Sequence, residues 1–289
     1  MGRETSVVDH DPSPLADTEV HRVDATATGD EYRIFVGHCG VRPATTLYLT
    51  DANGFFGAAV DTIRLMGIAN HLPPMLVIGI GYPVGPLVET IDRRTKDYSP
   101  TADAAYGALF PEVPEMGGAS ATLAFIRDDL MPWVNARYAM PDSDSTLFGH
   151  SLAGLFATYA LLTAPETFSR YAIASPSLWW DNNLMTSIEQ HYAEAHTDLS
   201  AKVFFGIGAD ETYEGRVREA ANYPDALRAH ATAWPFDMVA DMTDLVDRLT
   251  ARRYPGLDLK TAVFDDEFHV TVGPLALSRA LRWLYNAPT

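Results

Sequence analysis

Cysteine is almost absent from this chain, in which Cys39 is the single example among 289 residues. One cysteine cannot form an internal disulfide, so the chain is not a disulfide-rich secreted scaffold. Long apolar runs are also missing, and none approaches the roughly 18–20 residues that cross a bilayer. The first ten residues lack the apolar segment of a signal peptide. These absences predict a soluble cytoplasmic protein.

Basic residues are scarce as well, because 21 Lys and Arg face 38 Asp and Glu and leave a net charge of -17. Nucleic-acid phosphates are bound by clusters of Lys and Arg, so this balance argues against a nucleic-acid partner. It argues equally against anionic membrane surfaces. With 47% hydrophobic residues and a mean hydropathy of -0.06, the chain can still bury a sizeable core. We expect residues 1–17 to form a flexible tail and residues 18–289 to form a single domain.

Short apolar runs alternate along the chain with segments that have the apolar spacing of helices. Two alternating runs around Gly29 and Asp30 predict an antiparallel hairpin. The rest is typical of an α/β fold, with a mostly parallel central sheet and helices on both faces. Residues 84–117, rich in proline, glycine and charge, are predicted to form a long loop. The expected strands are 20–25, 32–37, 46–51, 75–81, one ending at 148, 171–174, 201–208 and 257–264, and the expected helices include 55–69, 119–138, 155–162, 237–253 and 273–286.

A sharp strand-to-helix turn is predicted at Gly149-His-Ser-Leu-Ala-Gly154. Leu147 and Phe148 end a strand before it, and an apolar helix follows. In α/β-hydrolases such a nucleophile elbow has the pattern G-x-S-x-G and lifts a serine hydroxyl above the sheet. Ser151 is therefore the candidate nucleophile. Ala153 replaces the second glycine, which is the smallest change that adds a Cβ atom.

A serine hydroxyl needs a base to take its proton and a carboxylate to orient that base. In this fold the chain order is serine, acid, histidine. His269, just after the last predicted strand, has the position of the base, and His150 is the alternative. The acid is expected after the strand before the last, where Glu211 is the first choice and Asp210 the second.

Acyl transfer also needs N–H donors for the negative charge that develops on the carbonyl oxygen. One donor is expected to be the backbone N–H of Leu152, directly after the nucleophile. The second is expected in the loop after the strand at 46–51, where the backbone N–H of Ala52 or Asn53 is in place.

Several longer motifs accompany these residues, and with them the chain resembles the Putative esterase family of α/β-hydrolases. Siderophore (enterobactin-type) esterases belong to that family, and esterase D and the mycolyltransferases are more distant relatives. The likeness runs from about residue 32 to residue 285. The motifs are Leu47-Tyr-Leu-Thr-Asp-Ala-Asn53, Gly79-Ile-Gly-Tyr82, Arg93-Arg-Thr-Lys-Asp-Tyr-Ser-Pro-Thr101, Gly117-Gly118, Phe125-Ile-Arg-Asp-Asp-Leu-Met-Pro-Trp133, Ser175-Pro-Ser-Leu-Trp-Trp-Asp181 and Glu267-x-His269.

The resemblance implies a set of substrate-binding residues and two departures from the family pattern. Arg93 or Arg94 would hold a carboxylate or catecholate oxygen. Trp179 or Trp180 would stack on an aromatic acyl group. His150, beside the nucleophile, is placed in the same set. The departures are alanines where the family has glycines, at 153 in the elbow and at 52 in the oxyanion loop, and they predict altered activity.

Together these patterns predict a serine esterase that forms an acyl-enzyme on Ser151, with a polar or aromatic ester such as a siderophore lactone as substrate. An acyltransferase would use the same residues, and a non-catalytic binding protein on this fold is the alternative from another class. We expect a small-molecule ester as partner. No metal is expected, because no set of metal ligands stands out, and no cofactor is expected, because the sequence has no P-loop and no dinucleotide fingerprint. The sequence does not indicate an oligomeric state.

Overall fold

The computed structural model describes residues 15–111, 113, 115–140, 144–223, 228 and 236–286. Most of the predicted tail, residues 1–14, lies outside this part of the chain. The first described element begins at Thr18. The organisation of residues 18–289 as one domain therefore stays a prediction.

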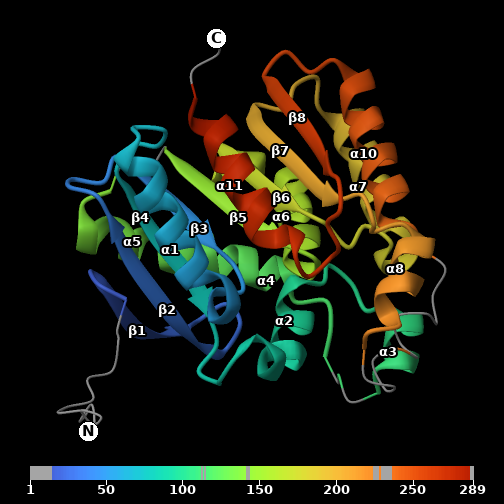
Figure 1. Cartoon of the computed structure of the whole chain (residues 1–289), viewed down its shortest axis with the longest axis horizontal. Coiled ribbons are helices and arrows are strands. Elements are labelled where there is room, and N and C mark those ends of the chain that lie inside the picture. Colours follow the sequence, from blue (N-terminus) through green and yellow to red (C-terminus); the bar gives the residue numbers. More distant parts are fainter. Residues whose placement is uncertain are drawn as a thin grey trace, which may run out of the picture.

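The described residues form an eight-stranded sheet in the order β1-β2-β4-β3-β5-β6-β7-β8 (Figure 1). β1 pairs antiparallel with β2, and β2 with β4, whereas the later neighbours are parallel. The predicted α/β-hydrolase fold, with a mostly parallel sheet and an antiparallel hairpin at its start, is confirmed. The strands are β1 Thr18–Ala25, β2 Asp30–Cys39, β3 Thr45–Leu49, β4 Met75–Gly81, β5 Ser145–His150, β6 Arg170–Ala174, β7 Ala201–Gly208 and β8 Leu257–Phe264.

Helices cover both faces of the sheet, and in Figure 1 α1 and α11 cross in front of the strands. Neighbouring strand residues point to opposite faces. Leu47 therefore joins the core under α1 and α11, whereas Tyr48 joins the larger core under α6, α7 and α10. The helices are α1 Ala52–Ile68, η1 Leu87–Thr90, α2 Ile91–Tyr98, α3 Ala104–Leu109, α4 Ala119–Ala124, η2 Phe125–Leu130, α5 Met131–Tyr138, α6 Leu152–Thr163, η3 Pro165–Thr167, α7 Trp180–Ala195, α8 Tyr213–Ala220, α10 Met238–Arg252 and α11 Val272–Tyr285.

The predicted long loop at residues 84–117 is wrong in part, because η1, α2 and α3 lie within it. Charged side chains of α2 make tertiary contacts with β2. Lys96 Nζ lies 2.9 Å from the Asp30 carboxylate, and the Tyr32 hydroxyl donates to the Asp97 carboxylate at 2.7 Å. Residues that suggested a solvated loop therefore stabilise a packed helix.

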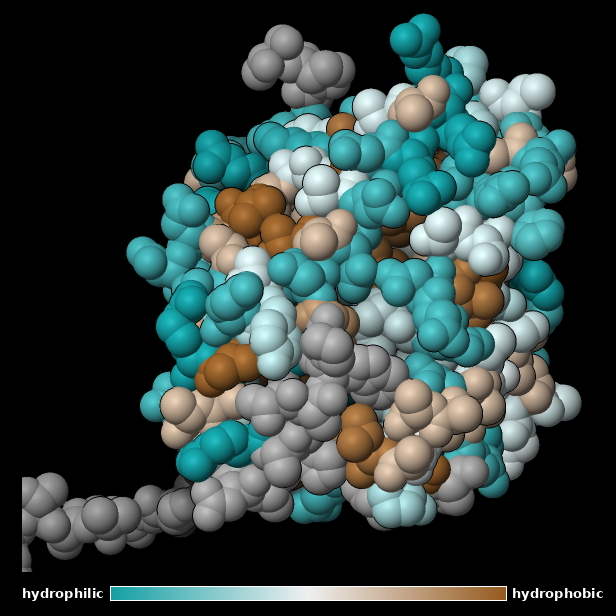
Figure 2. Space-filling view, turned by 90° about the vertical axis from the view of Figure 1, so that its right-hand side faces the viewer, coloured by the Kyte–Doolittle hydropathy of each residue, from teal (hydrophilic) through white to brown (hydrophobic). Residues whose placement is uncertain are grey.

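The surface around α8 and α10 is mostly hydrophilic. Figure 2 looks at that side and shows hydrophobic side chains only in scattered areas. Across the described ranges, no helix combines the length and the apolar character that crossing a membrane requires. The cytoplasmic location expected from the sequence stays a prediction.

The turn after β5 predicts a contrast between two Gly→Ala substitutions. A Cβ atom at Gly149 would overlap the carbonyl of Ala153, whereas at Gly57, inside α1, it would meet no atom within 4 Å. We expect Gly149→Ala to lower the free energy of unfolding by at least about 2 kcal/mol. Gly57→Ala should raise it by about 0.5–1 kcal/mol. Urea unfolding followed by circular dichroism measures both, and equal midpoints for the two variants would contradict this packing.

Candidate active site

Ser151 occupies the sharp turn between β5 and α6. Its backbone has φ 64° and ψ -122°, a conformation that costs a residue with a side chain about 1–3 kcal/mol. The Ser151 N–H donates to the Ala174 carbonyl at 3.1 Å, and the Ser177 N–H donates to the Ser151 carbonyl at 3.1 Å. The serine is thus held at the carboxyl end of the parallel strands, where such sheets bind ligands.

The alanine in the elbow fits the packing around it. A Cβ atom at Gly154 would lie 2.8 Å from the Ala174 carbonyl oxygen and 2.9 Å from Pro176 Cα. The position that must remain glycine on this side of the turn is therefore Gly154. Ala153 is fully buried in α6, and its methyl group is part of the larger of the two hydrophobic cores.

A chain of hydrogen bonds joins Ser151 to residues from two later loops. The Ser151 hydroxyl donates to His269 Nε2 at 2.9 Å, and His269 Nδ1–H donates to Glu211 Oε2 at 2.6 Å. Glu211 follows β7, and His269 follows β8. These distances suit proton transfer from the serine and orientation of the imidazole by the carboxylate. The structure thus brings together the first-choice nucleophile, base and acid.

The Glu211 carboxylate is fully buried and well supplied with donors. Its Oε1 accepts hydrogen bonds from the Ser175 hydroxyl at 2.6 Å and from the Gly208 N–H at 2.8 Å. Burial by itself raises the pKa of Glu211. The charge of His269 and the hydrogen bonds from His269, Ser175 and Gly208 outweigh burial, so the pKa lies below its ordinary value. Glu211 is therefore ionised at neutral pH.

The alternative acid and the alternative base have other partners. The Asp210 carboxylate pairs with Arg218 at 2.5 Å. His150 Nε2–H donates to the backbone carbonyl of His269 at 2.9 Å, and the two rings lie 4.8 Å apart. Burial, then His269 and Arg94, lower the pKa of His150 well below its ordinary value. A neutral His150 therefore fixes the loop that carries His269.

Two helix N-termini contain the predicted oxyanion-hole residues. Leu152 is the first residue of α6, and Ala52 and Asn53 are the first two of α1. N–H groups in a first helical turn have no partner within their own helix. The Asn53 side chain fixes the start of α1, because its Oδ1 accepts from the Tyr82 N–H at 2.8 Å and its Nδ2 donates to the Gly85 carbonyl at 2.8 Å.

Ala52, where the resemblance implies a glycine, is nearly fully buried. A Cβ atom at Gly79, in β4, would lie 2.8 Å from the Ala52 Cβ. The bare backbone of Gly79 therefore makes room for the Ala52 methyl group.

Arg94 is paired inside the protein. Its Nε and Nη2 donate to the two carboxylate oxygens of Asp51 at 3.0 and 2.7 Å, and the side chains are 13% and 1% exposed. Asp51 precedes α1 with a left-handed φ of 52°. The ion pair therefore holds the residue next to the predicted oxyanion loop, and removal of one partner of such a buried pair costs about 3–5 kcal/mol.

Arg93 and Trp180 have partners elsewhere in the protein. Among the described residues that line the pocket beside Ser151, neither occurs, whereas Trp179 does. Arg93 Nη2 lies 3.6 Å from the Asp30 carboxylate. Trp180 is fully buried, and its Nε1–H donates to the backbone carbonyl of residue 101 at 3.1 Å.

The pocket beside Ser151 and His269 has a volume of about 180 Å³. The Trp179 and Phe236 rings stack in its wall at 4.6 Å, and the Arg216 guanidinium lies 3.4 Å from the centre of the Phe236 ring. Burial lowers the pKa of Arg216. Phe236 and Arg216 are not among the predicted site residues, because they lie in segments without a motif. In the part of the chain that the structure describes, no cluster of three or more His, Cys, Asp or Glu could hold a metal ion.

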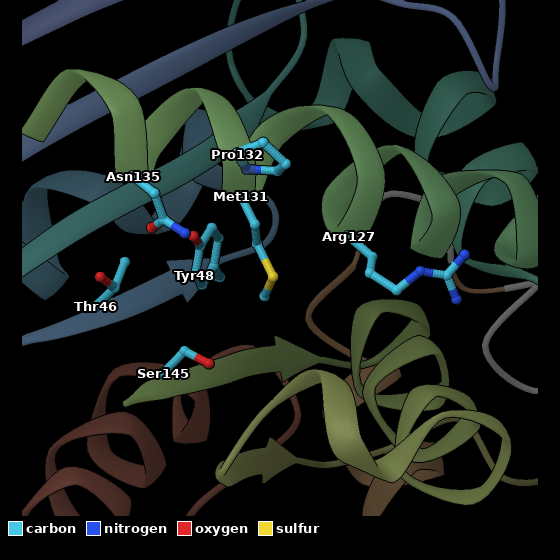
Figure 3. A pocket seen from close by; sticks show the side chains of 7 residues that line it. All are labelled: Thr46, Tyr48, Arg127, Met131, Pro132, Asn135 and Ser145. Carbon is cyan, nitrogen blue, oxygen red and sulfur yellow. The ribbon is translucent and has the colours of Figure 1, made fainter. Parts of the chain in front are cut away.

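A second cavity, of about 210 Å³, lies at the other end of the strands (Figure 3). Thr46 and Ser145 line it near the amino ends of β3 and β5, and Met131 and Asn135 line it from α5. Ser151 follows the carboxyl end of β5. This cavity is therefore separate from the candidate active site.

The fold and the site define an α/β-hydrolase with a serine, histidine and carboxylate in hydrogen-bond contact. A family model described as Putative esterase matches residues 26–256. The chain belongs to this family and is a carboxylic ester hydrolase.

Similar proteins cover nearly the whole chain. The ferri-bacillibactin esterase BesA of Bacillus subtilis is 28% identical over 276 residues, which cover 92% of this chain and 89% of that protein. The siderophore enterobactin esterase of Emericella nidulans is 32% identical over 263 residues, which cover 86% and 85%. The crystal structure of the BES protein from Bacillus cereus has a TM-score of 0.79 at 24% identity, over 98% of this chain and 100% of that chain, and shows the same fold.

The two neighbouring carboxylates predict different mutational effects. We expect Glu211→Gln to lower kcat by about 10³- to 10⁴-fold, because an amide does not stabilise the imidazolium that forms when His269 takes a proton. Asp210→Asn is the matched control and should change kcat by less than about 2-fold, since its exposed ion pair contributes little. Ester hydrolysis rates and circular dichroism of both variants measure this. A large loss confined to Asp210→Asn would reassign the acid.

The hydroxyl of Ser175 predicts a shift in pH dependence. Ser175→Ala removes a donor to the charged form of Glu211, so the pKa of that carboxyl should rise toward its ordinary value. The Glu211 carboxyl should then take up its proton at a higher pH than in the wild type, which an NMR titration of its carboxyl carbon measures. Ser99→Ala removes another buried hydroxyl, which donates to the Thr95 carbonyl at 2.7 Å, and should leave the Glu211 titration in place. Equal titration curves for the two variants would show that Ser175 does not tune Glu211.

Proposed function

We propose that this chain is a serine esterase that hydrolyses a siderophore-type ester. The observation that carries the proposal is the hydrogen-bonded chain from Ser151 through His269 to Glu211, beside a pocket lined by aromatic side chains, one arginine and one glutamate. Support also comes from the two relatives named as a ferri-bacillibactin esterase and a siderophore enterobactin esterase.

In the acylation step, Ser151 Oγ attacks the ester carbonyl carbon while its proton moves to His269 Nε2. The backbone N–H of Leu152 and that of Ala52 or Asn53 stabilise the negative charge on the carbonyl oxygen. The carbon–oxygen bond to the alcohol breaks, and the alcohol leaves with the proton held by His269. The acyl group stays on the serine as an ester.

In the deacylation step, a water molecule attacks the same carbonyl carbon and gives its proton to His269. The bond to Ser151 Oγ breaks, the serine recovers its proton, and the carboxylic acid is released. Glu211 keeps its charge throughout, because its pKa lies below the ordinary value. It therefore stabilises the imidazolium in both steps without taking up a proton itself.

The pocket suggests how a large ester is recognised. Its volume of about 180 Å³ is below the roughly 300–1,000 Å³ of sites that enclose a whole drug-sized ligand. It therefore takes one arm of the substrate and leaves the rest outside. The Phe236 ring is already covered by Trp179 and by Arg216. Trp179 therefore offers the ring surface for an aromatic arm, and Arg216, which lines the same pocket, offers a guanidinium to its oxygen atoms. A catechol-bearing acyl arm meets these requirements.

Fluorophosphonate labelling with intact-mass detection tests the proposed function. We expect the wild type to gain one adduct, because the proton of Ser151 can pass to His269 as the serine attacks phosphorus. Ser151→Ala and His269→Ala should gain none while keeping the circular dichroism of the wild type. A folded wild type that stays unlabelled would contradict the proposal.

Chromatography of reactions with enterobactin, bacillibactin and triacetylfusarinine C then tests the substrate class. We expect the wild type to open at least one of the two catechol esters with a higher kcat/KM than it shows for p-nitrophenyl acetate. Trp179→Ala should lower kcat/KM for that catechol ester by about 10-fold and leave the small acetate nearly unchanged. New esters formed with an added alcohol would instead indicate an acyltransferase.

A further inference from the structure

A trough runs along the edge of the sheet between β8 and α11. Its volume is about 680 Å³, and among the described residues it shares no lining residue with the pocket beside Ser151. We call it the β8–α11 trough and define it by six of its side chains, Lys202, Lys260, Phe264, Arg279, Arg282 and Trp283.

The trough exists because the helical layer ends before the sheet does. α11 packs on β6 and β7, whereas β8 is the last strand of the sheet. In Figure 1 none of the described helices crosses in front of β8. Lys260 and Phe264 are an even number of residues apart, so they share one face of β8. Arg279, Arg282 and Trp283 follow helical spacing and share one side of α11.

The charge of the trough is opposite to that of the chain as a whole. Four basic side chains and one acidic side chain line it, in a chain with a net charge of -17. The acidic Asp258 lies 3.8 Å from Lys202 Nζ. Within the described part of the chain, Lys260, Arg279 and Arg282 have no carboxylate within 4.0 Å. Three cations without a paired carboxylate give this wall a positive potential that attracts anions.

Aromatic rings lie beside these cations. Phe264 and Trp283 are half-buried, so part of each ring is accessible from the trough. Lys202 Nζ lies 4.7 Å from the centre of the Trp283 ring, and the Phe204 ring lies 6.2 Å from it on the core side. The trough therefore combines ring faces with guanidinium and ammonium groups.

We propose that the β8–α11 trough binds a small aromatic anion. Its carboxylate or phosphate pairs with Arg279, Arg282 and Lys260, because a guanidinium fork matches both kinds of oxyanion. Its ring lies against Phe264 and Trp283. This binding is separate from ester hydrolysis, so it holds whether or not the proposed substrate is correct.

Isothermal titration calorimetry of the full chain tests the proposal, with 1-naphthoate and 1-naphthyl phosphate as probes. We expect one saturable site, with the tighter probe identifying the oxyanion that the trough prefers. Inorganic phosphate, which lacks the ring, and 1-naphthylmethanol, which lacks the charge, should bind at least about 10-fold more weakly. Binding should persist after Ser151 has been blocked with a fluorophosphonate.

Exposed arginines provide matched variants for this experiment. Arg279→Gln combined with Arg282→Gln should weaken the tighter probe by at least about 10-fold, and Lys260→Gln should weaken it as well. Arg22→Gln combined with Arg248→Gln makes the same change in net charge elsewhere and should leave the affinity unchanged.

Several results would overturn the proposal. They are the absence of saturable binding by the wild type, equal affinity of the two double variants, and loss of binding when Ser151 is blocked. A wild-type dimer in analytical ultracentrifugation that Arg279→Gln with Arg282→Gln dissociates would also overturn it, because a second copy would then occupy the trough.

Discussion

A single residue with φ 64° joins β5 to α6, and the site depends on that turn. The turn contains no other residue. The strained backbone of Ser151 therefore persists only if neighbouring backbone groups hydrogen-bond to both its N–H and its carbonyl. The residues that do so, Ala174 and Ser177, come from the end of β6. Ser175 lies between them with a left-handed φ of 42° and donates to Glu211. One short segment therefore stabilises the turn at Ser151 and orients the Glu211 carboxylate at the same time.

Burial affects the protonation states of the ionisable side chains in this site differently, depending on the partners of each side chain. Glu211 is buried with donors on both oxygens, so it keeps its negative charge. His150 is buried against another imidazole, so it is neutral and acts through one N–H. Arg94 and Asp51 are buried as a bidentate pair, in which the attraction of Asp51 outweighs burial and raises the pKa of Arg94. Each group thus has one charge state and one orientation before any substrate binds.

The sequence predicted those features that depend on local pattern or on chain order. The glycines around Ser151 indicated the elbow, and the strand order placed Glu211 and His269 at the same edge of the sheet. Contacts between residues that are far apart in the sequence produce no local sequence pattern from which they could be predicted. Arg94 and Asp51 are 43 residues apart. The resemblance implied a substrate contact for Arg93 or Arg94, whereas the side chain of Arg94 pairs with Asp51 inside the protein. The same holds for α2, because Lys96 and Asp30 are 66 residues apart and the charge of the segment suggested a loop.

The hydrogen bond between Ser151 and His269 spans 118 residues of the chain, and that separation sets the order in which the site is completed. Glu211 lies between them in the sequence, 58 residues before His269. During synthesis the elbow can form while its base has not yet been translated. Since His269 follows β8, a nascent chain that has not reached this residue has Ser151 without the imidazole to which its hydroxyl donates. Under the proposed mechanism, the chain therefore gains the ability to attack an ester only after His269 has been translated.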